Sequence, residues 1–115
     1  MSSDAVSLLL MKYEQNARDW DQAVSDVRKA NALFDRTHGL YKRLRANREG
    51  RLGIAALLTD PNPGVRVMAA THSLDWHEAE AVAVLEALER AGGLYAVTAK
   101  YTLRGHRSGS LNLDW

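Results

Sequence analysis

The sequence predicts an all-α domain of five or six helices. Apolar residues recur at intervals of three and four over most of the 115-residue chain, which is the spacing of one helix face. Glycine, proline, asparagine and aspartate gather where this periodicity is interrupted, as they do at helix ends. No pair of alternating segments predicts a β-hairpin. We therefore expect a single domain over residues 1–115, large enough to bury its own core.

The first helix is expected to begin at Asp4, whose carboxylate can cap it, and to end near residues 18–21. Its apolar face carries Val6, Leu9, Leu10, Tyr13 and Ala17. A longer second helix is expected from Val24 to about Ala46. Its stripe is Val24, Val27, Ala30 or Asn31, Phe34, His38, Tyr41 and Leu44. Gly39 costs about 1 kcal/mol relative to alanine inside a helix, so a bend near His38 and Gly39 is an open alternative.

Two shorter helices joined by a proline-containing turn are expected next. The polar, glycine-flanked stretch Asn47 to Gly53 predicts a connection, and Leu52 to Thr59 predicts a third helix. The side chains of Asp60 and Asn62 can accept hydrogen bonds from backbone N–H groups, and Pro63 suits the first turn of a fourth helix.

Packing across this turn involves one arginine and small residues. Arg66 can reach Asp60 or the carbonyl groups that end the third helix. The small side chains of Ala69 and Ala70 let the fourth helix, which runs to Leu74, approach its partner closely. The structural positions of the hairpin are Leu58, Asp60, Pro63, Val65, Arg66 and Ala69.

Two further helices are expected to close the domain. Asp75 can cap a helix from Glu78 to Ala91, which Gly92-Gly93 ends. The inner face of this helix carries Ala81, Val82, Leu85, Leu88 and Ala91. The last helix covers about Leu94 to Leu103, with Tyr95, Thr98 or Ala99, and Thr102 on one side. A loosely structured tail is expected from about residue 105, although Leu111, Leu113 and Trp115 alternate as a docked extended segment would.

Three segments resemble a known family. They are Leu33-Phe34-Asp35, the run LLTDPNPGVRVMAA at residues 57–70, and Ala99-Lys100-Tyr101-Thr102-Leu103. Together they resemble the bacterial DUF2019 family of small HEAT-like domains, and the resemblance implies a short HEAT-like right-handed superhelix. The family is defined without a known activity, so the resemblance implies no catalytic residue. Its small, solitary domains are similar to immunity proteins encoded beside bacterial toxins.

Composition narrows the classes of function. The chain has no cysteine, which excludes disulfides, thiolate nucleophiles and thiolate zinc sites. The N-terminal residues lack the basic residues and long apolar run of a secretory signal, and the apolar run Leu8 to Met11 is too short to span a bilayer. We expect a cytoplasmic protein.

Reaction chemistry has little support in the sequence. His72, Asp75, His77 and Glu78 or Glu80 are the densest group of potential metal ligands, but their spacing fits no familiar zinc motif. Asp75 is better explained as a helix cap. His38 is expected to be partly buried and hydrogen-bonded, and His106 to be solvated. Because neither a Gly-x-Ser-x-Gly motif nor a phosphate-binding glycine pattern occurs, we expect no enzyme, no metal and no cofactor.

Binding surfaces are better candidates. Tryptophans lie at element ends, where Trp20 and Trp76 are expected to pack mainly inside the domain and Trp115 can serve either role. Acidic residues on the fifth helix would complement a basic partner such as the active-site cleft of a toxin that cuts nucleic acid. The residues expected to contact a protein partner are Trp76, Glu78, Glu80, Glu86, Glu89 and Trp115.

A basic run at residues 42–51 supports an alternative to a protein partner, which is nucleic-acid binding. Its lysine and arginine side chains could neutralise a nucleic-acid backbone. The residues are Lys42, Arg43, Arg45, Arg48 and Arg51. Against this alternative stand the formal net charge of +1 and the lack of aromatic residues within the run.

The sequence therefore predicts a protein-binding helical module that is monomeric when free. In its sharper form, the hypothesis is an immunity protein that neutralises a cognate bacterial toxin by occluding its active site. A HEAT-like nucleic-acid-binding domain is the alternative, and no membrane partner is expected.

Overall fold

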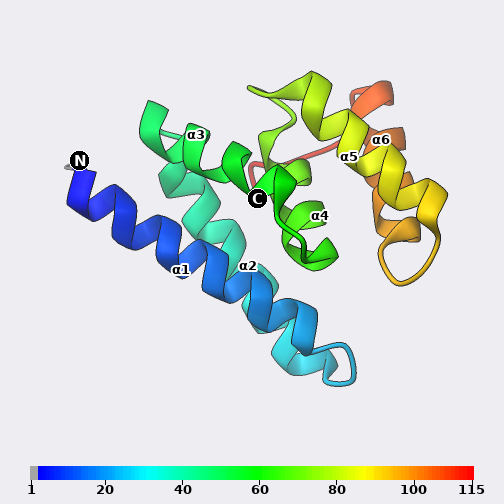
Figure 1. The fold of residues 1–115 in the computed structure, drawn as a ribbon, viewed down its shortest axis with the longest axis horizontal. Coiled ribbons are helices and arrows are strands. Elements are labelled where there is room, and N and C mark those ends of the chain that lie inside the picture. Colours follow the sequence, from blue (N-terminus) through cyan, green and yellow to red (C-terminus); the bar gives the residue numbers. More distant parts are fainter. Residues whose placement is uncertain (1–2) are drawn as a thin grey trace.

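Six α-helices and one turn of 3₁₀ helix follow one another along residues 3–115, the part of the chain that the computed structural model describes (Figure 1). They are α1 (Ser3–Gln22), α2 (Val27–Leu44), α3 (Arg48–Ala56), η1 (Leu57–Thr59), α4 (Pro63–Ser73), α5 (Glu78–Ala91) and α6 (Ala96–Ser108). No strand occurs among these residues, which confirms the predicted all-α class.

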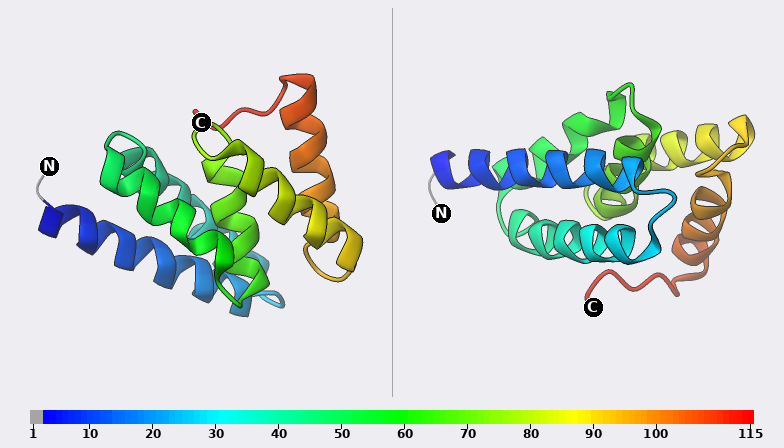
Figure 2. Two further views of the ribbon diagram at one scale, coloured as in Figure 1. Left: turned by 45° about the horizontal axis from the view of Figure 1, so that its top comes forward. Right: turned by 90° about the horizontal axis from the view of Figure 1, so that it is seen from below.

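The helices stack in the order of the sequence. The α1/α2 hairpin lies at one end, the α5/α6 hairpin lies at the other, and α4 lies between them (Figures 1 and 2). Helix α3 runs through η1 into the turn that starts α4. After α6 the chain turns back, and residues 109–115, called the tail below, return toward α2 (Figure 2).

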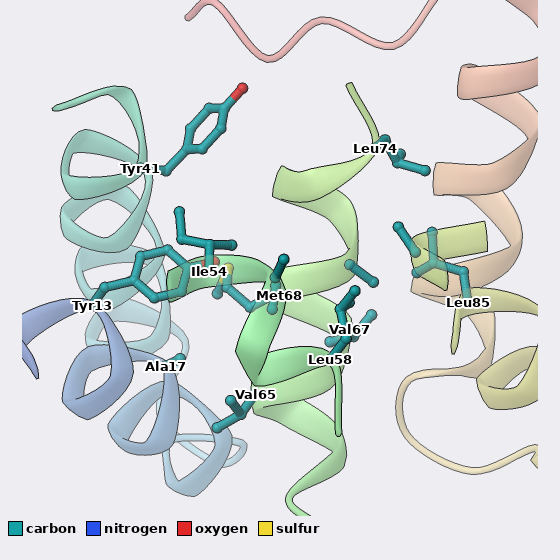
Figure 3. Close-up of a cluster of buried hydrophobic side chains, with 14 of the residues drawn as sticks. Tyr13, Ala17, Tyr41, Ile54, Leu58, Val65, Val67, Met68, Leu74 and Leu85 are labelled. Atoms are coloured by element: carbon teal, nitrogen blue, oxygen red, sulfur yellow. The ribbon is translucent and has the colours of Figure 1, made fainter. Parts of the chain in front are cut away.

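Helix α4 carries buried residues on nearly all of its sides. They are Gly64, Val65, Val67, Met68, Ala69, Ala70, His72 and Ser73. Figure 3 shows Val65, Val67 and Met68 among side chains from α1, α3, η1 and α5. Such a helix is stable in water only when neighbours enclose it, because the apolar area removed from water contributes about 25 cal/mol per Å².

Local hydrogen bonds fix the starts of three helices. The side chain of Asp26 accepts from the N–H of Lys29 at 3.1 Å, and that of Asn47 accepts from the N–H of Gly50 at 2.8 Å. The side chain of Asn62 accepts from Gly64 and Val65 at 2.8 and 3.2 Å, directly before Pro63. Glycines mark the C-terminal end of α5. Gly92 and Gly93 have φ of 71° and 82°, and the helix ends there as predicted.

The turn before α4 is held by two arginines. The Asp60 carboxylate accepts from Arg18 of α1 at 2.6 Å, and the guanidinium lowers the pKa of that carboxyl. Arg66 donates from Nη1 to the carbonyl oxygens of Asp60 and Pro61, both at 2.9 Å. Arg66 therefore binds the carbonyl groups of the turn, while the Asp60 side chain ties the turn to α1.

Several predicted boundaries are wrong. Asp4 lies inside the first turn of α1 rather than capping it. Residues 47–53 are not a connection, because Asn47 caps α3 and the helix begins at Arg48. Helix α2 begins at Val27 rather than Val24 and continues through Gly39 to Leu44.

The second half of the chain also differs from the prediction at its helix ends. The residue that precedes α5 is His77 rather than Asp75, and it makes no side-chain capping bond. Helix α6 continues to Ser108, so the tail begins at Gly109 and not near residue 105. The N–H groups of Ser110 and Leu111 both donate to the carbonyl of Gly105, at 2.9 and 3.1 Å. These bonds close the last turn of α6.

Leu58→Ala is expected to lower the free energy of unfolding by about 2–5 kcal/mol, because Leu58 is 3% exposed and truncation leaves a cavity in the core. Urea denaturation measures this change. Leu52→Ala is the matched control, since Leu52 is 53% exposed and should change the free energy by less than about 0.5 kcal/mol. Equal effects at the two positions would contradict the packing described here.

Two helical glycines are expected to respond to alanine in opposite directions. A Cβ at Gly39 would meet nothing within 4 Å, so Gly39→Ala should raise the free energy of unfolding by about 0.5–1 kcal/mol. A Cβ at Gly50 would collide with the backbone carbonyl of Leu44, so Gly50→Ala should lower it by more than about 1 kcal/mol. Thermal unfolding of both variants, followed by circular dichroism, tests the signs.

Candidate functional site

The four glutamates predicted to face a partner do not form one open acidic surface. Glu78 lies 2.8 Å from Nε2 of His106, and Glu86 accepts from Arg107 at 3.1 Å, so both carboxylates bind side chains of α6. Glu80 lies 3.0 Å from Nε2 of His77, the residue that precedes α5. Glu89 is exposed near the end of α5.

One histidine expectation is corrected by the same contacts. His106 is not a solvated tail residue, because it lies in α6 with 22% of its side chain exposed and bonds to Glu78. The paired carboxylates thus join α5 to α6.

Trp76 lies two residues before Glu78, at the start of α5, whereas Trp20 belongs to α1 and Trp115 to the tail. Trp76 is half-buried, donates from Nε1 to the carbonyl of Arg51 at 2.9 Å and lies over Tyr41 with ring centroids 6.1 Å apart. Trp20 is also half-buried and contacts the ring of Tyr95, with centroids 5.3 Å apart. Trp115 lies on α2, where its ring is 51% exposed. Of the predicted partner residues, Trp76, Glu78 and Glu80 are therefore neighbours at the start of α5, whereas Glu89 lies in its last turn and Trp115 lies in the tail.

Three members of the basic run bind the chain itself. Lys42 donates to the carbonyls of Asp114 and Trp115 at 3.3 and 3.2 Å. Arg45 pairs with the carboxylate of Asp114 at 2.9 Å. Arg51 donates to the carbonyl of Arg45 at 2.9 Å. These cations hold the tail and the start of α3.

The other two members, Arg43 and Arg48, are exposed.

A hollow of about 180 Å³, called the inner hollow below, lies between α2, α4, α6 and the tail. Most of the side chains that line it are apolar or aromatic. They are Trp20, Phe34, His38, Val67, Met68, Thr71, His72, Thr98, Thr102, Leu111, Asn112, Leu113 and Trp115. Because they come from five segments of the sequence, α1, α2, α4, α6 and the tail, no local motif marks this site.

Buried aromatic and imidazole rings stand beside the inner hollow. The hydroxyl of Tyr13 lies 2.7 Å from Nδ1 of His72, and the ring of Tyr41 stacks on His72 with centroids 4.1 Å apart. Burial, together with the positive charges of His38 and Arg45, lowers the pKa of His72 to about 3. His72 is therefore a neutral imidazole at neutral pH.

His38 differs from the expectation in one respect. It is buried, with 2% exposed, but its Nε2 has no hydrogen-bond partner. Its ring stacks on Trp115 with centroids 3.6 Å apart and planes within 6°. Burial, helped by the charges of Lys42 and Arg45, lowers the pKa of His38. A buried polar atom without a partner is costly, which makes this atom notable.

A second, more open hollow lies at the end of the α1/α2 hairpin. It has a volume of about 270 Å³ and is lined by Trp20, Ala23, Val24, Val27, Ala30, Asn31, Leu94, Tyr95 and Thr98. Val24, Val27 and Leu94 are 60%, 72% and 63% exposed. We call these three residues the apolar rim.

The apolar rim corrects the predicted core. Val24 and Val27 belong to the periodic stripe expected to be buried, yet both lie at the exposed end of the hairpin. The buried face of α2 instead carries Leu33, Thr37, His38, Tyr41 and Leu44. The sequence did not predict the rim as a site. Large apolar residues beside a turn could have indicated an exposed apolar patch.

Residues 3–115 hold neither a cluster of metal ligands nor a membrane-spanning helix. No group of three histidine, aspartate or glutamate side chains in this range is placed to hold a metal ion, and His72 and His77 bind other side chains. None of the helices in the same range is both long and apolar enough to pass through a membrane.

By its fold the chain is a small all-α protein, with six α-helices and one turn of 3₁₀ helix in residues 3–115. No family model, curated protein or solved structure matches the chain. The resemblance to the DUF2019 family stays a prediction.

The buried imidazole at position 72 predicts acid sensitivity. In the unfolded chain His72 has its ordinary pKa of 6.5, whereas in the folded chain its pKa is about 3. Stability should therefore be lost as the pH falls through this window, by about 2 kcal/mol between about pH 7 and pH 5. His72→Gln keeps an acceptor for the Tyr13 hydroxyl and does not titrate, so urea denaturation should show a flatter pH dependence for this variant.

Proposed function

We propose that this chain is a protein-binding helical module whose contact surface is the apolar rim of Val24, Val27 and Leu94. The observation that supports the proposal is the exposure of these three side chains, each more than half exposed around one hollow. Grouped apolar side chains on a soluble protein are typical of interaction sites. Burying one such side chain under a partner contributes about 1.5–3 kcal/mol.

The floor of this hollow is rigid, which favours binding. The hydroxyl of Tyr95 donates to Asp21 of α1 at 2.5 Å, and the Tyr95 ring packs against Trp20. These contacts join the start of α6 to the end of α1 and fix both rings. A preorganised floor loses little conformational entropy when a partner's apolar side chain enters.

In the sharper form of the proposal, the partner is a bacterial toxin whose active site the module covers. Two observations support it: the resemblance to the DUF2019 family and the acidic residues of α5. Glu89 lies in the last turn of α5, five residues before Leu94, and lines a hollow together with Lys100, Arg104 and Arg107. It is the acidic residue of α5 that we propose to contact a basic partner.

Photo-crosslinking tests the surface directly. A photoreactive phenylalanine analogue at position 27 should label one protein in cells of the source organism. The same analogue at position 52 should not, because Leu52 is also an apolar residue more than half exposed but lies on α3. Equal labelling from both positions would contradict the proposed surface.

Val27→Asp should then weaken binding of the purified, crosslinked protein by at least about tenfold, because a carboxylate would be desolvated in an apolar contact. Calorimetric titration measures the dissociation constant. Leu52→Asp serves as the control and should change it by less than about twofold. An unchanged affinity for Val27→Asp, with the circular dichroism spectrum intact, would remove the rim from the proposal.

Co-expression tests the toxin version separately. Cells that make a toxin encoded beside this gene should survive when they also make the wild-type chain and die when they make Val27→Asp. Death in both cases would overturn the toxin version, whereas the crosslinking result decides the broader one.

A further inference from the structure

The inner hollow has the size of a small-molecule site. Its volume of about 180 Å³ exceeds the roughly 150 Å³ of an engineered apolar cavity in another protein that stays dry and binds benzene. Three aromatic rings line it, those of Trp20, Phe34 and Trp115. A space of this size and lining accommodates one aromatic ring with a small substituent.

A polar group beside the hollow lacks a partner. His38 lines the hollow, is 2% exposed and leaves its Nε2 without a hydrogen bond. The other buried imidazole at the hollow, His72, already binds the hydroxyl of Tyr13. A ligand that supplied a hydrogen bond to His38 would remove the cost of this unpaired atom.

We propose that the inner hollow binds a small phenol, with its ring between the aromatic side chains and its hydroxyl hydrogen-bonded to Nε2 of His38. The hydroxyl suits His38 because it can both donate and accept, so it pairs with either tautomer of a neutral imidazole. The lowered pKa of His38 keeps that imidazole neutral near pH 7. No lysine, arginine, aspartate or glutamate side chain lines the hollow, which favours an uncharged ligand.

The tail provides the entrance. Residues 109–115 form no regular secondary structure, and they are held to α2 mainly by Lys42 and Arg45. The Trp115 ring stacks on His38, and Trp115 as a whole is 51% exposed. Nε2 of His38 has almost no accessible surface in the structure, so the proposed hydrogen bond requires the Trp115 ring to move aside. The inner hollow shares Trp20 and Thr98 with the hollow at the rim, but none of Val24, Val27 and Leu94 lines it, so the proposal does not depend on the protein-binding function.

The test compares phenol with toluene, which have nearly the same shape and differ in the hydroxyl. Both are titrated into the full chain and followed by the indole N–H resonances in NMR spectra. Trp20 and Trp115 line the hollow and should shift, whereas Trp76 does not line it and should not. Phenol should bind about three- to tenfold more tightly than toluene, the gain expected for one hydrogen bond.

Three variants distinguish the contribution of the His38 hydrogen bond from that of the volume of the hollow. His38→Phe keeps a ring against Trp115 and should abolish the preference for phenol while toluene still binds. His77→Phe, at a histidine outside the hollow, should leave the preference unchanged. Thr102→Leu adds bulk at the wall of the hollow and should weaken both ligands by about tenfold.

The wild-type titration alone can overturn the proposal. Equal affinities for phenol and toluene would rule out His38 as the hydrogen-bonding group. The absence of any shift at Trp20 and Trp115 at saturating phenol would exclude the site itself. A preference for phenol that survives in folded His38→Phe would assign the hydroxyl to another group.

Discussion

The enclosure of α4 is the constraint on which the rest of this structure depends. Gly64 leaves room for the Asp21 side chain of α1, Ala69 and Ala70 are small and fully buried, and the larger Val65, Val67 and Met68 point toward different neighbours (Figure 3). Because buried residues lie on nearly all sides of this helix, no single partner can cover it. The α1/α2 hairpin, α3 with η1, and the α5/α6 hairpin each cover part of it. His72 adds a polar requirement, since only a hydrogen bond such as that of Tyr13 makes a buried imidazole at this position tolerable.

Local sequence signals predicted the helix boundaries well where a side chain acts on its own backbone. Asn62 with Pro63 and Gly92 with Gly93 are such cases, because capping and positive φ are decided within a few residues. Gly50 and Gly53 misled the prediction of α3. Both resemble helix breakers, yet each permits a close approach, to the Leu44 carbonyl and to the Leu10 side chain. A sequence alone does not distinguish a glycine that ends a helix from one that makes room for a neighbour.

The candidate sites were less predictable than the fold. Periodicity placed Val24 and Val27 on one stripe with Leu44, but it could not show that the hairpin extends beyond its neighbours and leaves the two valines exposed. Charge counting identified the acidic residues of α5, but not that Glu78 and Glu86 are bound by α6. The inner hollow needs Phe34, Met68, Thr102 and Trp115 from four separate segments, and only the folded chain brings them together.

The return of the tail to α2 has a consequence for how the chain folds. Most packing here joins elements that are neighbours in sequence, which is the topology of fast folders. The contact of Lys42 with Asp114 instead closes a loop of 72 residues. Closing this loop costs conformational entropy, and only a few bonds to the tail offset that cost. The tail is therefore the last segment to dock during folding and the first to detach in native-state fluctuations, so its amide hydrogens exchange before those of any helix core.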